Sequence, residues 1–221
     1  MKILLFGATG MVGKGVLREC LLDHDVEAVL ALGRAKTDEE NPKLREVVLK
    51  DLADLSSLEG ELATYDACFF CLGVSAAGMS EADYRRITHD LTLAVATMLV
   101  KLNPKMTFVY VSGNGTDSTE KGWQMWARVK GQTENELLAL PFERCFMFRP
   151  AMIQPMHGIR SRTGFYRVVY GALGPVLPML RGALPGLVTT TEIVGRAMVR
   201  VAKKGASKRV LENRDIGELG R

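Results

Sequence analysis

The chain begins Met1-Lys-Ile-Leu-Leu-Phe-Gly-Ala-Thr-Gly-Met-Val-Gly13, an apolar run followed by three glycines in the spacing G-x-x-G-x-x-G. Residues 2–6 have the length of a strand, and the apolar residues after the glycines recur at the spacing of a helix face. Gly7 allows a tight turn, Gly10 allows the backbone to approach a pyrophosphate, and Gly13 allows the helix to lie close to the sheet. Strand, glycine turn and helix in this order are typical of a dinucleotide-binding fold.

The N-terminus of the helix after the glycines is the expected phosphate site. A helix N-terminus offers free backbone N–H groups and a partial positive charge to an anion. We therefore expect a nucleotide to contact this turn through Gly7, Thr9, Gly10, Met11, Val12 and Gly13.

Strand-like and helix-like segments alternate as far as Pro150. After the first strand and helix, strands are predicted at residues 26–32, 44–49, 66–72, 106–111 and 142–148. Helices are predicted at residues 81–102 and 122–140. This alternation predicts an α/β fold with a doubly wound parallel sheet, the Rossmann architecture.

Beyond Pro150 the alternation breaks down, and residues 155–188 are rich in proline and glycine with helical patches such as residues 165–170. The run Thr-Thr-Thr-Glu at residues 189–192 predicts a capped helix that reaches about residue 204, with a short strand at 209–211. We expect a nucleotide-binding domain over residues 1–154 and a small C-terminal lid or substrate-side segment over residues 155–221, packed on that domain.

The composition is that of a globular protein, with 221 residues, 47% hydrophobic and 24% charged. The net charge of +4 is dispersed without a basic run, which argues against a nucleic-acid partner. No signal-peptide pattern and no apolar stretch of transmembrane length are present, so we expect a cytoplasmic protein without a membrane span. Cys68 and Cys71 spell C-x-x-C, but residues three apart on a strand face opposite sides, so we expect core thiols and no metal site.

The end of the second predicted strand bears on the type of nucleotide. Sites that prefer NAD usually carry a carboxylate there, whereas this chain reads Leu32-Gly33-Arg34. A guanidinium matches a 2′-phosphate in a bidentate geometry, so NADP is preferred over NAD. The alternative is that Arg34 is a solvated loop residue.

Asp51 and Leu52 follow the third predicted strand at the edge of the sheet where an adenine would lie. A carboxylate at this place can accept a hydrogen bond from the adenine amino group, while Leu52 packs on the ring. The alternative is that Asp51 only turns the chain.

Taken together, these motifs resemble the short-chain dehydrogenase/reductase superfamily in its extended or atypical branch, and the arrangement looks most like the small NmrA-like and Tat-interacting-protein group. The resemblance covers residues 1–155 well and the C-terminal third only through its predicted helix. Its carriers are the glycine motif, Asp51-Leu52, Cys71-Leu72-Gly73, Val111-Ser112-Gly113, Lys130-Gly131 and Phe148-Arg149-Pro150. The resemblance implies further cofactor contacts at Cys71, Leu72, Gly73, Lys130 and Pro150.

The resemblance also implies a catalytic serine after the fifth strand and a Tyr-x-x-x-Lys motif on the next helix. Ser112 takes the first place and Lys130 the last, but Trp126 stands where the tyrosine is expected. Residues four apart share a helix face, so Trp126 and Lys130 are expected at one site. An indole N–H donates a hydrogen bond but does not titrate usefully, and no tyrosine in the chain has a lysine four residues on.

His157, just past the sixth predicted strand, is a candidate for the missing proton donor, because histidine titrates near neutral pH. Nearby Arg160 and Arg162 would favour an anionic substrate. The alternative, which the sequence favours, is a solvated loop with ordinary charges.

Two classes of function follow. One is an NADP(H)-dependent oxidoreductase, or an epimerase or dehydratase, that acts on a small carbonyl or sugar-type substrate. The other is a catalytically weak NADP-sensing regulatory protein. The retained Ser112 and Lys130 favour the enzyme, whereas Trp126 favours the sensor.

Overall fold

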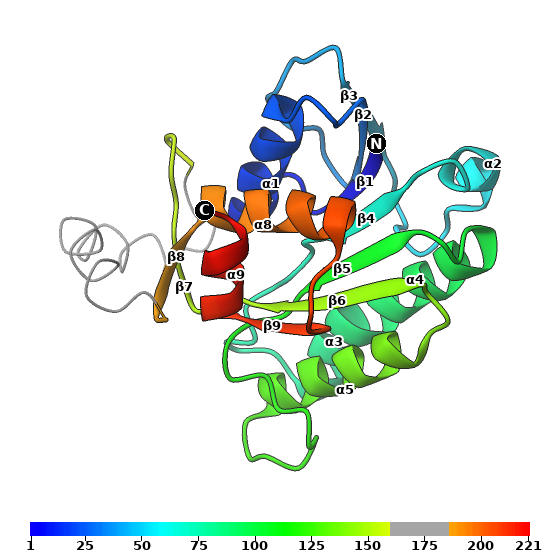
Figure 1. Ribbon diagram of the computed structural model, residues 1–221. Coiled ribbons are helices and arrows are strands. Elements are labelled where there is room, and N and C mark those ends of the chain that lie inside the picture. Colours follow the sequence, from blue (N-terminus) through cyan, green and yellow to red (C-terminus); the bar gives the residue numbers. More distant parts are fainter. Residues whose placement is uncertain (160–185) are drawn as a thin grey trace.

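The computed structural model describes residues 1–159 and 186–221, and these contain a seven-stranded parallel sheet (Figure 1). The strand order is β3-β2-β1-β4-β5-β6-β9. The strands are β1 (Lys2–Phe6), β2 (Ala28–Gly33), β3 (Leu44–Val48), β4 (Ala67–Phe70), β5 (Thr107–Val111), β6 (Arg144–Arg149) and β9 (Val210–Glu212). The predicted doubly wound parallel sheet is confirmed, with the order turning back at β1 and β4.

Helices cover both faces of the sheet. Figure 1 shows α1 (Met11–Leu22), α8 (Thr191–Lys204) and α9 (Asn213–Leu219) together on one face. The opposite face carries α3 (Glu81–Arg85), α4 (Leu91–Leu102) and α5 (Met125–Ala139), and a short helix α2 (Glu59–Leu62) follows a 3-10 turn at Ser56–Leu58. No helix in the described ranges is long and apolar enough to cross a membrane.

Two apolar cores lie on the two faces because side chains alternate along each buried strand. In β1, Ile3 and Leu5 join the core under α1 and α8, while Leu4 and Phe6 join the core under α4 and α5. Cys68 lies in the second core and Cys71 packs against the first, so the two thiols face opposite sides, as predicted.

The predicted helix at residues 81–102 is interrupted. A π-helical turn, Arg86–Asp90, separates α3 from α4. Within it, His89 is buried, and its ring nitrogens lie 2.7 Å from Asp90 and 3.0 Å from Glu136 of α5. A π-helical turn of this kind occurs within helical segments, and the apolar residues of α3 and α4 on either side recur at helical spacing, so the sequence predicted one continuous helix.

The C-terminal residues pack on the same sheet, with α8 on its face and β9 at its edge. The predicted cap of α8 is confirmed, since the Thr190 hydroxyl accepts the Ile193 N–H at 3.0 Å. A separate pair of parallel strands, β7 (Met152–Gln154) and β8 (Val188–Thr190), was not predicted, and neither was α9. The helical patches predicted at residues 165–170 lie outside the described residues.

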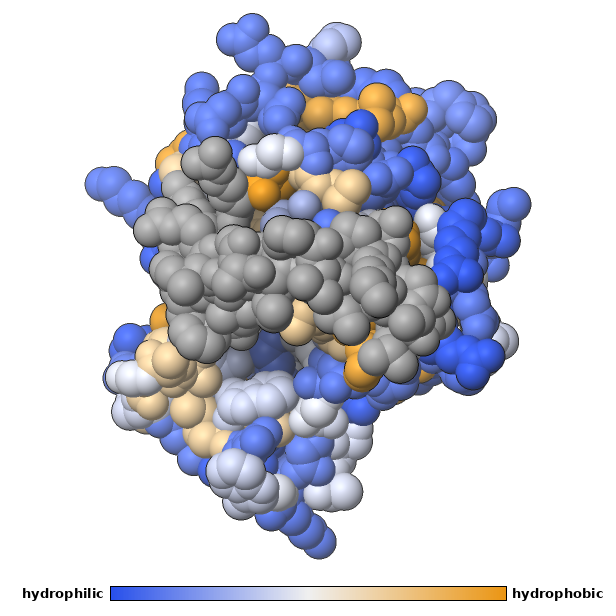
Figure 2. All heavy atoms as spheres, turned by 90° about the vertical axis from the view of Figure 1, so that its left-hand side faces the viewer, coloured by the Kyte–Doolittle hydropathy of each residue, from blue (hydrophilic) through white to orange (hydrophobic). Residues whose placement is uncertain are grey.

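Among the described residues, those visible in Figure 2 are mostly hydrophilic, with small apolar patches between them. Among the described residues the large exposed apolar side chains are Leu22, Val48, Val74, Trp123 and Leu187. Trp123 is the most exposed of them, at 88%, and it lies three residues before Trp126.

The helices α1 and α8 make a close crossing that depends on small residues. A Cβ atom on Gly15 would lie 2.8 Å from the carbonyl oxygen of Thr191. Beside the crossing, the buried Glu19 carboxylate accepts a hydrogen bond from Nε of Arg196 at 3.0 Å. This contact fixes α1 from the side opposite the sheet.

The crossing predicts a specific loss of stability. Because Gly15→Ala would force its methyl group against the Cβ and backbone of Thr191, we expect it to lower the free energy of unfolding by about 1–3 kcal/mol in urea denaturation followed by circular dichroism. The matched control is Gly60→Ala in α2, where an added Cβ meets no atom within 4 Å. That control should leave stability unchanged or raise it by up to about 1 kcal/mol. Equal stability of the two variants would contradict the packing described here.

Candidate functional site

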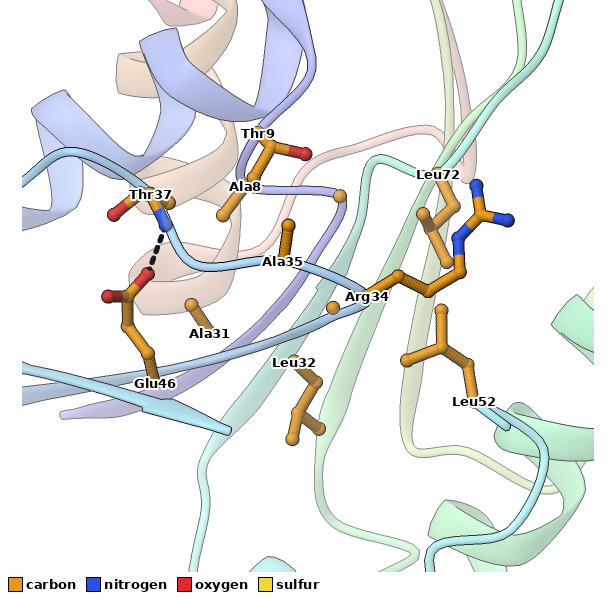
Figure 3. A pocket seen from close by; sticks show the side chains of 12 residues that line it. Ala8, Thr9, Ala31, Leu32, Arg34, Ala35, Thr37, Glu46, Leu52 and Leu72 are labelled. Atoms are coloured by element: carbon orange, nitrogen blue, oxygen red, sulfur yellow. Dashed lines mark hydrogen bonds between the residues drawn. The ribbon is translucent and has the colours of Figure 1, made fainter. Parts of the chain in front are cut away.

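A pocket of about 400 Å³ opens at the carboxyl ends of β1, β2 and β4 (Figure 3). It collects residues that are far apart in the sequence, including several that the sequence predicted to contact a nucleotide. Its lining is Gly7, Ala8, Thr9, Ala31, Leu32, Gly33, Arg34, Ala35, Thr37, Glu46, Leu52 and Leu72. The position beside the point where the strand order reverses is where ligands bind in open α/β sheets.

The glycine turn has the geometry that a pyrophosphate requires. Gly7 has φ +82°, and its carbonyl accepts the Gly10 N–H at 2.9 Å. A Cβ on Gly13 would lie 2.0 Å from that same carbonyl oxygen, so only glycine fits where α1 meets the turn. The N-cap Gly10 supplies no side-chain cap, and the first turn, which includes Met11 and Val12, holds no acidic residue. Backbone N–H groups are therefore available to an anion.

Charged side chains stand on opposite sides of the pocket. Figure 3 shows the exposed Arg34 extending toward Leu72 and Leu52, while Glu46 lies across the pocket beside Thr37. The Glu46 carboxylate accepts the backbone N–H of Thr37 at 2.6 Å. Arg34 forms no ion pair with the described residues, so its guanidinium is available to a ligand.

Of the two residues predicted to contact an adenine, Leu52 lines the pocket and Asp51 does not. Leu52 is buried and lines the pocket, whereas Asp51 is exposed and its carboxylate accepts the Ala53 N–H at 2.9 Å. This geometry matches the alternative in which Asp51 turns the chain. The Cys71 carbonyl backs the glycine turn, since a Cβ on Gly7 would approach it to 2.8 Å, while an added Cβ on Gly73 would meet open space.

Ser112, just after β5, points its hydroxyl into the protein. The Oγ lies 2.5 Å from the Glu134 carboxylate and 3.1 Å from the Phe148 carbonyl, both of which accept. Glu134 is fully buried, and Nε of Arg149 donates to both of its oxygens at 3.1 Å. The sequence predicted a catalytic role for Ser112, but it did not predict that the hydroxyl would bind Glu134.

The contacts of Glu134 were not predicted from the sequence. A signal was present: Glu134 falls in the buried stripe of α5 with Val129, Thr133 and Leu137, where a carboxylate needs a partner. The partner, Arg149, had been identified only as part of the motif at the end of β6.

Lys130 contacts the backbone of Ser112 rather than its hydroxyl. Its Nζ donates to the Ser112 carbonyl oxygen at 2.5 Å. Burial lowers the pKa of the Lys130 ammonium to about 8, and the nearby Glu134 carboxylate offsets only part of that shift. An ammonium with this pKa can both donate hydrogen bonds and give up a proton near neutral pH.

Trp126 lies one helical turn before Lys130, on the same face of α5. Its ring packs over the loop after β5, with Cη2 3.4 Å from the position that a Cβ on Gly115 would occupy. The same loop is tied to Pro150, whose carbonyl accepts the Asn114 N–H at 2.9 Å. The indole N–H donates to no group in the described part of the chain.

His157 lies elsewhere, in an exposed turn after β7 with φ +55°. Its Nε2 is 3.1 Å from the Glu192 carboxylate at the start of α8. Partial burial pushes the pKa of Glu192 up, but His157 and Arg196 outweigh it and lower that pKa. Within the described residues His157 has no contact with Lys130 or Ser112, and Arg160 and Arg162 lie outside the described residues.

The chain is 28% identical to the protein FMP52, mitochondrial, of Chaetomium globosum, in an alignment that covers 99% of this chain and 96% of the relative. It is also 28% identical to the protein HTATIP2 of Rattus norvegicus, covering 99% of this chain and 89% of the relative.

Solved structures show the same fold. A short chain dehydrogenase/reductase from Saccharomyces cerevisiae superposes with a TM-score of 0.70 at 13% identity, covering 99% of this chain and 98% of the other. The UDP-glucuronic acid 4-epimerase from Bacillus cereus in complex with NAD superposes with a TM-score of 0.67 at 14% identity, covering 96% and 76%.

Residues 3–119 match the model of the NAD dependent epimerase/dehydratase family. The match begins in β1, runs through the glycine turn and includes β5 and Ser112, which follows it. The resemblance to the short-chain dehydrogenase/reductase superfamily is thereby confirmed, and the chain belongs to the NAD-dependent epimerase/dehydratase family.

Proposed function

We propose that this protein is an NADP(H)-dependent oxidoreductase, or an epimerase or dehydratase, that acts on a small carbonyl or sugar-type substrate. The observation that supports turnover best is Lys130, a partly buried amine held at the carboxyl edge of the sheet by the Ser112 carbonyl. A lysine whose pKa burial lowers is costly to keep for structure alone and is typical of a working site.

The residues around the pocket fit a nicotinamide dinucleotide. The close approach of Gly13 to Gly7 and the uncapped N-terminus of α1 suit a pyrophosphate. Leu52 and Leu72 offer apolar walls to an adenine. The dinucleotide, when bound, would supply or accept a hydride.

The choice of NADP over NAD rests on charge. Arg34 reaches over the pocket with no partner among the described residues, and a guanidinium fork suits a 2′-phosphate. The carboxylate that lines the pocket, Glu46, is held by the Thr37 N–H on the far side. It would not repel a phosphate at Arg34 as strongly as a carboxylate at the end of β2.

The chain's own residues would then divide the remaining work. Lys130 has two further N–H groups beyond the one given to Ser112, and these can bind ribose hydroxyls. Trp126 fills the space in which a tyrosine would stand and narrows the site over Gly115. Its flat ring excludes water and presents an apolar surface to the substrate.

A second function, an NADP-sensing regulatory protein, is favoured by one observation. The Ser112 hydroxyl is engaged with buried Glu134, and Trp126 cannot transfer a proton, so two members of the expected catalytic set are not free for chemistry. In this reading the nucleotide binds in the same pocket and alters the affinity for a partner.

The cytoplasmic location expected from the sequence remains part of the proposal. The relatives of this chain from Chaetomium globosum and Emericella nidulans are named as mitochondrial proteins, so the mitochondrion is the alternative location.

The nucleotide preference is tested by titrating NADPH and NADH against the wild type and Arg34→Ala. Losing the pair with the 2′-phosphate should weaken NADPH binding by about 10–100-fold and leave NADH binding within about twofold. The control is Lys36→Ala, an exposed cation two residues away that does not line the pocket. Equal affinities of the wild type for the two nucleotides would contradict the preference.

The place of Trp126 is tested by Trp126→Tyr, which adds a titratable hydroxyl beside Lys130. We expect turnover of generic aldehydes and quinones, followed by NADPH absorbance, to rise by about 10–100-fold, within the range of a general acid.

Trp126→Phe, which lacks the hydroxyl, should give no such gain. Trp123→Tyr, the same change at an exposed position, should leave turnover unaltered. If Trp126→Tyr binds NADPH but reduces none of the carbonyl compounds, the result favours the NADP-sensing function.

A further inference from the structure

Among the predicted catalytic residues near the end of β5, Lys130 keeps a titratable proton, and its amine lies against the Ser112 carbonyl. Trp126 does not titrate, and the Ser112 hydroxyl is donated to the Glu134 carboxylate inside the protein. His157 is bonded to Glu192 at the start of α8. We propose that Lys130 is the proton donor of the reaction, and that its ammonium replaces the missing tyrosine. This inference rests on the oxidoreductase function proposed above.

The position of Lys130 suits this role. It stands one helical turn beyond Trp126, so the ammonium and the indole share the face of α5 that meets the end of β5. Its hydrogen-bond partner is the Ser112 carbonyl, a neutral acceptor. A carboxylate partner would hold the proton on the amine, whereas a carbonyl orients the ammonium without preventing its loss. Two of its three N–H groups remain for a ribose and a substrate oxygen.

The charges around Lys130 are already paired with one another. Glu134, one turn further along α5, is bound by Arg149 of β6 and by the Ser112 hydroxyl. On the loop after β5, the Asp117 carboxylate accepts from Thr119 and Gly122. The polar side chains between α5 and the neighbouring helical segments also have partners of their own. Arg128 of α5 pairs with Glu81 of α3, and Arg85 of α3 contacts Asp90 and Gln132. His89 of the π-helical turn contacts Asp90 and Glu136.

The environment of Lys130 makes its proton available near neutral pH. An ordinary lysine has a pKa of about 10.4 and gives up its proton poorly at neutral pH. Burial lowers the pKa of Lys130 to about 8. Below that pH most of the lysine carries its proton, and above it the amine is neutral. Carbonyl reduction should therefore slow as the pH rises through about 8, and alcohol oxidation should speed up.

The step balances as a carbonyl reduction. The substrate carbon takes a hydride from the reduced nicotinamide nucleotide, and the carbonyl π bond breaks onto oxygen. That oxygen takes a proton from the Lys130 ammonium, which gives an alcohol and a neutral amine. Water returns a proton to the amine before the next turnover.

The first measurement needs no turnover. Protein labelled with [ε-¹³C]lysine is titrated by NMR, and the Lys130 signal is assigned by its absence from Lys130→Arg. We expect it to titrate near pH 8, apart from the other lysines. A Lys130 signal that titrates with the exposed lysines, at about 10 or above, would overturn the proposal.

The second measurement separates a proton donor from a fixed positive charge. Lys130→Arg keeps the cation, yet arginine does not lose its proton below about pH 12. We expect it to bind NADPH within about threefold of the wild type and to lose turnover by about 10²–10⁴-fold. Lys130→Ala should recover turnover with added ethylamine or other small amines, in an order set by the pKa of each amine. Lys101→Arg, on α4, is the exposed control.

The outcomes distinguish the two proposals. If Lys130→Arg keeps the wild-type rate and pH profile, Lys130 is not the donor, while the oxidoreductase function stands. If amines rescue Lys130→Ala without regard to their pKa, the side chain only fills space and the proposal fails. If the wild type binds NADPH but reduces no carbonyl, the oxidoreductase function fails and takes this inference with it.

Discussion

The contact between Gly13 and the carbonyl of Gly7 is the constraint from which the rest of the site follows. The helix α1 lies so close to the turn that no side chain fits between them. This approach sets where the first N–H groups of α1 point and therefore where an anion would bind. It also sets the height of α1 above the sheet, which in turn lets Gly15 meet the backbone of α8. The pocket and the packing of the C-terminal helix thus share one cause.

A second constraint lies on the other side of the sheet, in the buried pair of Glu134 and Arg149. It joins α5 to β6 and accepts the Ser112 hydroxyl at the end of β5. Removing one partner of such a pair leaves a buried charge and costs about 3–5 kcal/mol, so the network is hard to rearrange. As a result the Ser112 carbonyl, rather than its hydroxyl, faces Lys130. The structural core and the chemistry of the site are coupled at this residue.

The sequence revealed the parts of the fold whose cause is local. Strands buried on both faces read as continuous apolar runs, and the glycine turn requires glycine for reasons visible in its own thirteen residues. The π-helical turn around His89 and the three-residue strands β7 and β8 leave almost no pattern. Side-chain directions at the site depend on partners far along the chain, as with Ser112 and Glu134, or His157 and Glu192. No spacing rule identifies such partners, so these hydrogen bonds could not be predicted from the sequence.

The crossing of α1 and α8 has a consequence for how the protein is made. Residues 191–204 leave the ribosome long after β1 and α1, and only then is the outer side of α1 covered. Until that moment the nascent chain carries an uncovered apolar helix on an incomplete sheet, with β9 still absent from its edge. Contacts between such distant segments form slowly, because a long loop must close first. The helix after the glycine turn is therefore made early and is covered by α8 only late in synthesis.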